Sequence, residues 1–283
     1  MSAAKDLISQ FSDIQTLPHV VTHLSKLMAD SESTIKQFED VIKMDPILVV
    51  QLLKLVNSPF YGLVQKVDSI SRAVAYLGMK NIHNIAVTEA LKTIFTDKTT
   101  TSLFSRQKLW LHCAAVSICS KMVAERIFGI NGDDTYLTGI LHDFGLIVEE
   151  QVKGAELHEI CKECSSNLNM LDLERKHFGT DHCEIGYQMT LEWNMPTHIQ
   201  EAIRDHHTLL DDVRPESLTG ILQIAEYLTS QHKYTTLEDL NVKISAPLME
   251  HIQDNIDEYT VLIEDFPDEM ANARDLYIGG TSG

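Results

Sequence analysis

The sequence lacks the features of a membrane protein and of a protein with a basic surface. Its longest apolar run lies around Ile47–Val50, far below the roughly 20 residues that span a bilayer, so we expect no membrane partner. The 283 residues include 23 Lys and Arg against 41 Asp and Glu, which gives a net charge of −18. Nucleic acids and acidic lipids bind basic surfaces, so this charge argues against nucleic acid as a partner.

Cysteine is also scarce, and the ends of the chain show no export signal. The five cysteines are odd in number and irregularly spaced, which suits reduced thiols better than a disulfide framework. The N-terminus, Met1–Asp6, is not followed by the apolar core of a signal peptide. We therefore expect a cytoplasmic protein. Histidine is the abundant exception, with 13 residues, and it directs attention to a site built from imidazoles.

The apolar residues recur with the period of a helix along most of the chain. In Ser33–Lys43 they are spaced three and four residues apart, as one buried helix face requires. Asp45 and Pro46 resemble an N-cap and a first helical residue, and they predict a helix at Ile47–Asn57 that is buried on nearly all sides. No segment alternates strictly between apolar and polar residues, so the predicted fold class is all-α.

The same periodicity divides the chain into helices and parts. Further helices are expected at 69–78, 79–95, 157–164, 170–178, 182–193, 197–207, 218–231 and 248–266. A segment rich in Thr and Ser, 97–105, is a candidate hinge. We therefore predict a two-lobed helical protein, with an N-terminal helical lobe at 1–100, a helical bundle at 101–235 and a C-terminal helical extension at 236–283.

The central candidate site is the pair His142 and Asp143. On a helix, adjacent side chains point about 100° apart, so both can reach one metal ion at that side. Gly139 and Gly145 flank the pair and remove side chains that would hold a neighbouring helix away. An isolated His-Asp pair is weak support for a metal site, because it also occurs by chance.

Other inward-facing polar residues strengthen this interpretation. His112 lies on an apolar helix face, His206 ends the apolar series of its helix with His207 beside it, and Glu226 lies close to a buried stripe. Each one alone is more simply read as an ordinary core or surface residue. Together they favour a shared site, and imidazole with carboxylate suits Fe, Mn, Zn or Ni better than Ca²⁺.

The chain resembles the HDOD family, whose members are degenerate relatives of the HD-domain metal-dependent phosphohydrolases. The likeness covers roughly residues 8–232, and the motifs that carry it are Leu17-Pro18, Asp45–Leu48, Asn57–Gly62, Ser69–Asn84, Leu141–Gly145, Trp193–Pro196 and His206-His207. The resemblance implies an all-helical protein of two lobes, the second an HD-like bundle. It also implies a signalling or regulatory role, since many members have lost catalysis.

The ligand pattern of active HD and HD-GYP enzymes can be carried over by position. The resemblance implies that one or two divalent ions would be held by His112, His142, Asp143, His182, His206, His207 and Glu226. Glu226 stands where the family pattern ends in aspartate, which keeps the charge and lengthens the side chain. The chain thus retains more of the ligand set than a degenerate relative must.

Two differences from the pattern of active HD-GYP enzymes argue against catalysis. Leu146 occupies the position at which active HD-GYP enzymes usually have a lysine suited to substrate phosphate, and the acidic segment Thr208–Asp212 replaces the GYP loop. We therefore expect a non-catalytic regulatory HDOD module with a retained metal site. Its partner would be an unidentified signalling protein, or it would bind a small phosphorylated ligand.

Two alternatives stay open. One is a metal-dependent phosphohydrolase acting on a nucleotide, a cyclic dinucleotide or another phosphate ester. The other is a redox or metal sensor without turnover, since Cys113, Cys119 and Cys183 lie near the histidines along the sequence. We do not count these cysteines among the expected ligands.

Overall fold

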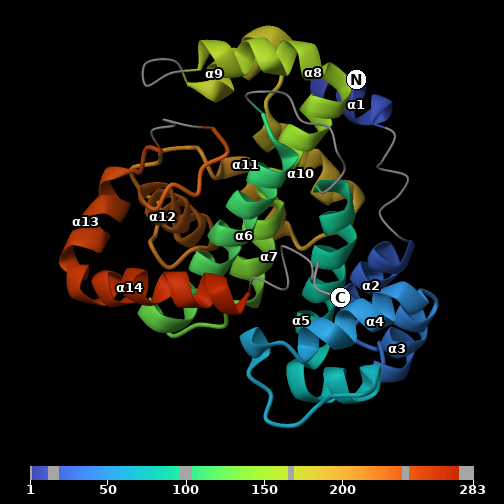
Figure 1. Cartoon of the computed structure of the whole chain (residues 1–283). Helices are drawn as coiled ribbons and strands as arrows, with labels where there is room; N and C mark the ends of the chain where they lie inside the picture. The colour runs from blue at the N-terminus through green and yellow to red at the C-terminus, as the bar shows by residue number, and fades with distance from the viewer. Residues whose placement is uncertain (1, 12–18, 96–103, 165–168, 238–241, 274–283) are drawn as a thin grey trace. The chain divides into compact units, whose positions relative to one another are not determined.

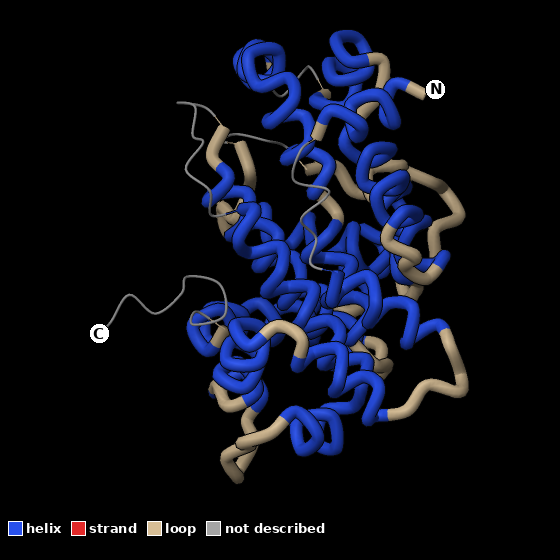
Figure 2. Tube along the Cα trace, turned by 90° about the vertical axis from the view of Figure 1, so that its right-hand side faces the viewer, coloured by secondary structure: helices blue, strands red, loops and turns tan. Residues whose placement is uncertain are grey.

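The computed structural model is built from helices and loops (Figures 1 and 2). It describes residues 2–11, 19–95, 104–164, 169–237 and 242–273. Within these ranges there is no β-strand, so the predicted all-α fold class is confirmed. None of the described helices combines the length and the apolar character needed to cross a membrane.

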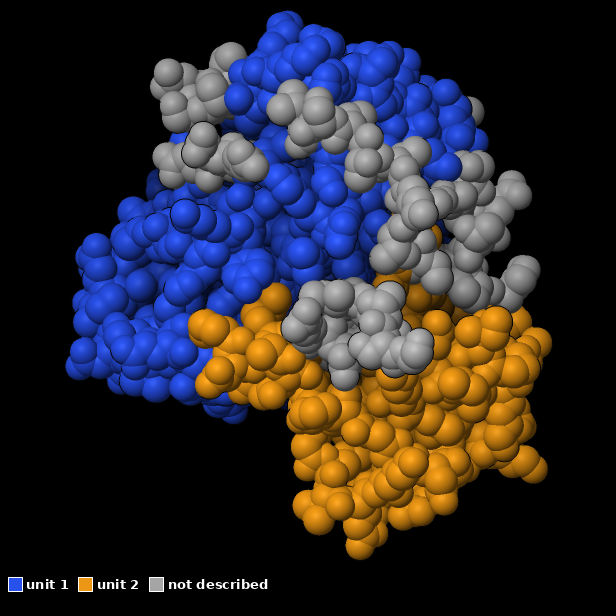
Figure 3. Space-filling model, viewed as in Figure 1, with its two compact units in different colours: residues 1–12, 95–266 blue, residues 13–94, 267–283 orange. Residues whose placement is uncertain are grey.

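The chain forms two compact units (Figure 3). Unit 1 contains residues 1–12 and 95–266, and unit 2 contains residues 13–94 and 267–283. The expected division at residues 100 and 235 stays a prediction, and most of the expected hinge lies outside the described residues. The first helix, α1 (Ala3–Gln10), contacts helices of unit 1.

Unit 2 consists mainly of four helices, which begin and end where local sequence signals require. They are α2 (His19–Ala29), α3 (Ile35–Lys43), α4 (Pro46–Val56) and α5 (Ile70–Phe95), with a short 3₁₀ helix, η2 (Pro59–Tyr61). The predicted N-cap is confirmed, because the Asp45 side chain accepts from the backbone N–H groups of Ile47 and Leu48 at 3.0 Å. The predicted break at Gly78 is also present, with φ of 80° inside α5.

The prediction that the helix after Asp45 is buried on nearly all sides is wrong. Ile47 and Val50 are 71% and 68% exposed, whereas Leu48 and Leu52 on the other side are buried. The apolar run suggested burial all round, but α4 packs mainly through the side that faces α3. Composition alone does not show which faces of a helix have neighbours.

Unit 1 is built around its helix α6, most of whose residues are buried. In Figure 1, α6 contacts α7 and α12, while α10 packs against α8 and α11. The elements are α6 (Arg106–Met122), a π-helical turn η3 (Val123–Ile127), α7 (Asp133–Leu141), α8 (Phe144–Glu163), α9 (Met170–Phe178), α10 (His182–Glu192), α11 (Thr197–Asp205), α12 (Leu218–Gln231), α13 (Ala246–Asp254) and α14 (Ile256–Asn272), whose last six residues belong to unit 2.

An aromatic core fills the space between these helices. The ring of Phe144 lies 5.8 Å from Phe95, 5.4 Å from Trp193 and 6.2 Å from Phe11, mostly in edge-to-face orientation. Trp110 on α6 continues the cluster at 4.9 Å from Phe95. Phe144 directly follows the His142-Asp143 pair in sequence, so its packing in this aromatic cluster fixes the start of α8.

The C-terminal segment predicted as one helix over 248–266 is two helices, so that prediction is wrong. The chain breaks at Asn255, whose side-chain amide donates to the carbonyl of His251 at 2.8 Å. The apolar spacing continues across the break, which explains the error. His251 stacks on Phe128 at 5.2 Å, and Phe266 lies 5.7 Å from Tyr234, so both helices pack within unit 1.

Two glycines beside the His142-Asp143 pair permit close packing, as expected from the sequence. A Cβ atom on Gly139 would lie 2.5 Å from Cα of Ser117 on α6. A Cβ atom on Gly145 would overlap the backbone carbonyl of His182 at the start of α10. The backbones of α7, α8 and their neighbours can approach this closely only because these positions lack a side chain.

The substitution Gly145→Ala should therefore destabilise the protein, whereas Gly154→Ala should not. The added methyl at 145 must displace the His182 backbone, and we expect a loss of about 2 kcal/mol or more in the free energy of unfolding. A methyl at 154, in the same helix α8, meets no atom within 4 Å and should be neutral or slightly stabilising. Denaturant unfolding of both variants tests this, and equal stabilities would contradict the packing argument.

Candidate metal centre

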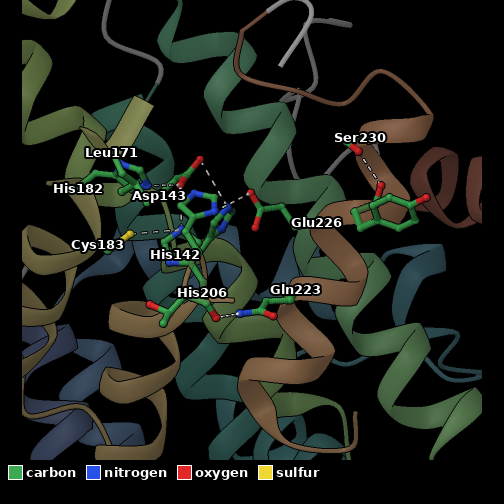
Figure 4. Close-up of polar contacts among 12 residues, drawn as sticks. His142, Asp143, Leu171, His182, Cys183, His206, Gln223, Glu226 and Ser230 are labelled. Carbon is green, nitrogen blue, oxygen red and sulfur yellow. Dashed lines mark hydrogen bonds and ion pairs between the residues drawn. The ribbon is translucent and has the colours of Figure 1, made fainter. Parts of the chain in front are cut away.

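The structure brings all seven predicted ligand residues together in the interior of unit 1. Figure 4 labels His142, Asp143, His182, His206 and Glu226 among them. We call this set the seven-residue cluster: His112 from α6, His142 and Asp143 from the α7–α8 junction, His182 from the first turn of α10, His206 and His207 from the end of α11, and Glu226 from α12. Their role as metal ligands stays a prediction.

His142 and Asp143 do not lie within one helix, which corrects the sequence-based expectation. His142 follows the last residue of α7, and Asp143 precedes the first residue of α8. The chain changes direction between the two helices at this point. Both side chains nevertheless face the same interior, because the turn places them at the meeting point of two helix ends.

Asp143 lies at the centre of the cluster and faces four imidazoles. Its Oδ2 atom is 3.4 Å from Nε2 of His112 and 3.5 Å from Nε2 of His142. Its Oδ1 atom is 3.5 Å from Nε2 of both His182 and His206. The two oxygens of one carboxylate therefore face two different pairs of histidines.

In each of these four histidines, the Nδ1 atom, which faces away from Asp143, lies beside a hydrogen-bond acceptor. His112 Nδ1 lies 2.7 Å from the carbonyl of Tyr234, and His142 Nδ1 lies 2.8 Å from that of Gly139. His206 Nδ1 lies 2.6 Å from the carbonyl of its own α11 neighbour Ile203. Because a carbonyl oxygen only accepts, each Nδ1 must donate a proton to it.

The fourth histidine, His182, is held by a carboxylate. Its Nδ1 atom lies 2.8 Å from Oε2 of Glu174, and its backbone N–H donates to the same oxygen at 3.0 Å. With the proton on Nδ1, the Nε2 atom of a neutral ring carries a lone pair. Metal-binding histidines commonly have such a carbonyl or carboxylate behind them, because it fixes the tautomer and the ring orientation.

The inward nitrogens and the Asp143 carboxylate form a crowded polar centre. Nε2 of His112 lies 3.2 Å from Nε2 of His142, so one ring must donate a proton to the other unless a cation lies between them. Nε2 of His182 and Oδ1 of Asp143 are buried and make no hydrogen bond within the described part of the chain. A cation would satisfy all of these atoms, so the donor set fits a divalent metal.

The remaining two members extend the centre toward α12. Nδ1 of His207 lies 3.7 Å from Oε1 of Glu226, and the His207 side chain, 25% exposed, is the most accessible of the cluster. Gln223, one turn before Glu226, donates its amide to the carbonyls of Asp205 and Thr208 at 3.2 and 3.0 Å. These two bonds fix the backbone on both sides of the histidine pair.

The charges within the cluster reflect this crowding. Burial opposes ionisation of Asp143, but the surrounding imidazoles outweigh it and hold the pKa of the carboxyl well below its usual range. Burial lowers the pKa of His142 to about 3, so that ring is neutral. Burial also raises the pKa of Glu226 to about 7. Burial opposes charge on His112, His182 and His206 too, but nearby acidic groups outweigh it and raise the pKa of each ring, so these rings would release protons when a metal binds.

Three polar residues near the cluster were not among the predicted ligands. Glu174 occupies a buried position of α9 one turn after Met170, and a carboxylate on that apolar face was the available signal. Cys183, which the sequence suggested only for the sensor alternative, lies with its Sγ within 4.8 Å of the ligand atoms of three histidines. Glu149 is fully buried in α8, and burial and the nearby Glu174 raise the pKa of its carboxyl well above the usual range.

The candidate ligand atoms form three groups, each with members within 4.8 Å of one another. They are His112, His142 and Glu226; His142, Asp143 and His206; and His182, Cys183, His206 and His207. The first and last groups share no residue, and Asp143 faces members of both. The arrangement can therefore accommodate one or two ions.

The surroundings offer little for a phosphorylated substrate. Leu146, at the position of the family lysine, is buried and apolar. Asp211 and Asp212, which follow the histidine pair, are exposed and negatively charged. These features match the two departures noted in the sequence.

Comparisons with known proteins agree with this fold. A proposed phosphohydrolase from Shewanella amazonensis SB2B has a solved structure similar at a TM-score of 0.72 and 22% identity, covering 98% of both chains. A proposed signal transduction protein from Marinobacter aquaeolei VT8 is similar at 0.70 and 20% identity, covering 98% of this chain and 63% of that one. At these identities the likeness shows a common fold.

Sequence comparison carries the assignment further. An uncharacterized protein from Treponema pallidum (strain Nichols) is 27% identical over 219 residues, which are 73% of this chain and 40% of that protein. The chain thus spans less than half the length of this relative. The HDOD domain model matches residues 14–209, which is more than half of the chain. The protein belongs to the HDOD family.

Proposed function

We propose that the protein is a regulatory HDOD module of the cytoplasm that holds one or two divalent ions in the seven-residue cluster. It would act through contacts with a signalling protein and not by hydrolysing a phosphate ester. A small phosphorylated ligand is the other kind of partner compatible with the family. Fe, Mn, Zn and Ni all suit a set of imidazoles and carboxylates.

The observation that carries this proposal is the inward direction of four Nε2 atoms around one carboxylate. Hydrogen-bond acceptors beside Nδ1 fix the orientation of four rings, those of His112, His142, His182 and His206. Gathering buried polar atoms with too few hydrogen-bond partners, such as Nε2 of His182 and Oδ1 of Asp143, costs free energy. A bound cation would offset that cost.

The ligands also suggest how binding could be transmitted. They come from α6, the α7–α8 junction, α10, α11 and α12, so an ion bound to them would hold these elements in one arrangement. A partner that prefers this arrangement would bind more tightly to the metal-loaded protein. The protein would signal through the difference in partner affinity between its two states.

Three observations favour regulation over catalysis. Six members of the cluster are buried, and only His207 is partly exposed, which limits access for a substrate. Leu146 supplies no charge to bind a phosphate. The exposed Asp211 and Asp212 repel a phosphodiester from the side of the histidine pair.

Metal binding should stabilise the protein measurably. At a free ion concentration about 100 times Kd, binding adds about 2.7 kcal/mol to the free energy of unfolding. For a unit of this size, that raises Tm by about 5 to 10 °C. The measurement is thermal unfolding of chelator-treated protein with and without Zn²⁺, Mn²⁺ or Fe²⁺, together with elemental analysis of the untreated protein.

The matched variants are His142→Ala and His198→Ala. His142 is buried in the cluster, and its loss should abolish the rise in Tm with Mn²⁺ and reduce the rise with Zn²⁺. His198 is exposed and pairs only with Asp134 at 3.0 Å, so its loss should leave the rise intact. A wild-type protein that contains no metal and melts at the same temperature with each ion would overturn the proposal.

A metal-dependent phosphohydrolase is the second candidate. It is favoured by Asp143, whose two oxygens face two separate sets of histidines as a bridging ligand in a two-ion centre would. A divalent ion in such a centre acts as a Lewis acid and lowers the pKa of a water molecule. The half-buried His207 would then be the residue nearest to an entering phosphate.

Hydrolysis assays distinguish the two candidates. We expect metal-loaded protein to release no product above a metal-only blank from p-nitrophenyl phosphate, its bis ester, nucleotides or cyclic dinucleotides. Turnover that depends on Mn²⁺ or Fe²⁺ and disappears in both His142→Ala and Asp143→Ala, while circular dichroism shows folded variants, would establish the enzyme instead.

A further inference from the structure

We propose that Cys183 is a metal ligand and that, with His182, His206 and His207, it forms a sulfur-containing position distinct from the carboxylate-containing one. This inference rests on the proposed function, since it requires that the seven-residue cluster bind metal. It assigns this position to a thiophilic ion of the Zn²⁺ class and not to Mn²⁺ or Mg²⁺. It also adds a residue that the sequence analysis left out of the ligand set.

The geometry places the thiol among the imidazole nitrogens. Sγ of Cys183 lies 3.9 Å from Nε2 of His206, and the candidate ligand atoms of all four residues lie within 4.8 Å of one another. Cys183 is buried, as are His182 and His206. Ligands about 2.0 to 2.3 Å from a tetrahedral metal lie less than 4 Å apart. The Cys183–His206 pair already has such a spacing, and the wider pairs would have to close by about 1 Å when an ion binds.

The start of α10 explains how two adjacent residues serve the same position. The Asp181 side chain accepts from the backbone N–H of Glu184 at 2.8 Å and fixes the first turn of the helix. His182 and Cys183 are the first two residues of that turn and project about 100° apart. Gly186, one turn later, has no side chain, which lets α10 lie close to Ile203 on α11.

An unpartnered nitrogen points independently to a ligand at this position. Nε2 of His182 is buried and makes no hydrogen bond within the described part of the chain, although Glu174 holds the other ring nitrogen firmly. His206 is likewise held by the carbonyl of Ile203, and its ring centre lies 4.1 Å from that of His207. Three imidazoles and a thiol then surround a point where no protein atom satisfies His182.

The sulfur-containing position differs chemically from its neighbour. His112, His142 and Glu226 form a group of nitrogen and oxygen donors, whereas the group around Cys183 adds sulfur. In the view of Figure 4, Cys183 and Glu226 lie on opposite sides of the imidazoles. Thiolate ligands favour Zn²⁺ and related ions, and carboxylates are compatible with Mn²⁺, so the two positions should differ in metal preference.

A buried cysteine is often only a small apolar residue, and Cys119 is an example of that role. Cys119 is fully buried on α6, and burial alone raises the pKa of its thiol to about 12. It belongs to none of the ligand groups among the described residues, whereas Cys183 does. This contrast makes Cys119 the natural control for Cys183.

Cobalt substitution tests the proposal directly. Chelator-treated full-length protein is loaded with Co²⁺, which occupies zinc sites and gives a sulfur-to-cobalt charge-transfer band in the near ultraviolet only when a thiolate is bound. We expect the wild type and Cys119→Ser to show the band, and Cys183→Ser to lose it. We also expect Cys183→Ser to bind Zn²⁺ at least about tenfold more weakly, with Mn²⁺ binding unchanged.

The outcomes separate this inference from the proposed function. If the wild type binds cobalt without the band, or Cys183→Ser retains the band, Cys183 is not a ligand, while metal binding by the cluster stands. If the wild type binds none of the three ions by elemental analysis, both proposals fail. The wild-type spectrum decides the point even if Cys183→Ser does not fold, and Cys183→Ala provides a second variant.

Discussion

The structure of unit 1 depends on how four buried imidazoles are held. Carbonyl groups of Tyr234, Gly139 and Ile203 and the carboxylate of Glu174 occupy one nitrogen of each ring. The Nε2 atoms of the four rings therefore face one another around Asp143. Buried polar atoms without hydrogen-bond partners are unfavourable, and this donor set fits a divalent cation that would satisfy them.

Close packing is the second requirement, because the ligands come from distant parts of the chain. His112 and Glu226 are more than a hundred positions apart, and α6 and α12 must lie against each other to bring them together. Gly139 likewise lets α7 approach α6, and Gly145 lets α8 approach α10, where any side chain would collide with backbone. The amide of Gln223 then fixes the turn that carries the paired histidines. The polar centre is thus supported by apolar and backbone contacts on all sides.

Much of the local structure could be predicted because it depends on neighbours in sequence. The N-cap at Asp45 and the break at Gly78 are set by side-chain acceptors and backbone freedom within a few residues. The apolar spacing across Asn255 misled the prediction of one long helix, since periodicity does not register a local change of direction. The apolar run at Ile47 and Val50 misled the prediction of burial for a similar reason.

The sequence by itself determined the helical class through its periodicity, and its motifs carried the family resemblance that implied the seven clustered residues. Periodicity and motifs are properties of the linear chain. The tertiary structure alone decided which ring nitrogens face inward, that Asp143 faces two sets of histidines, and that Cys183 lies among them. These features depend on distances between helices far apart in sequence. Such distances arise only when the helices pack, so no local pattern encodes them.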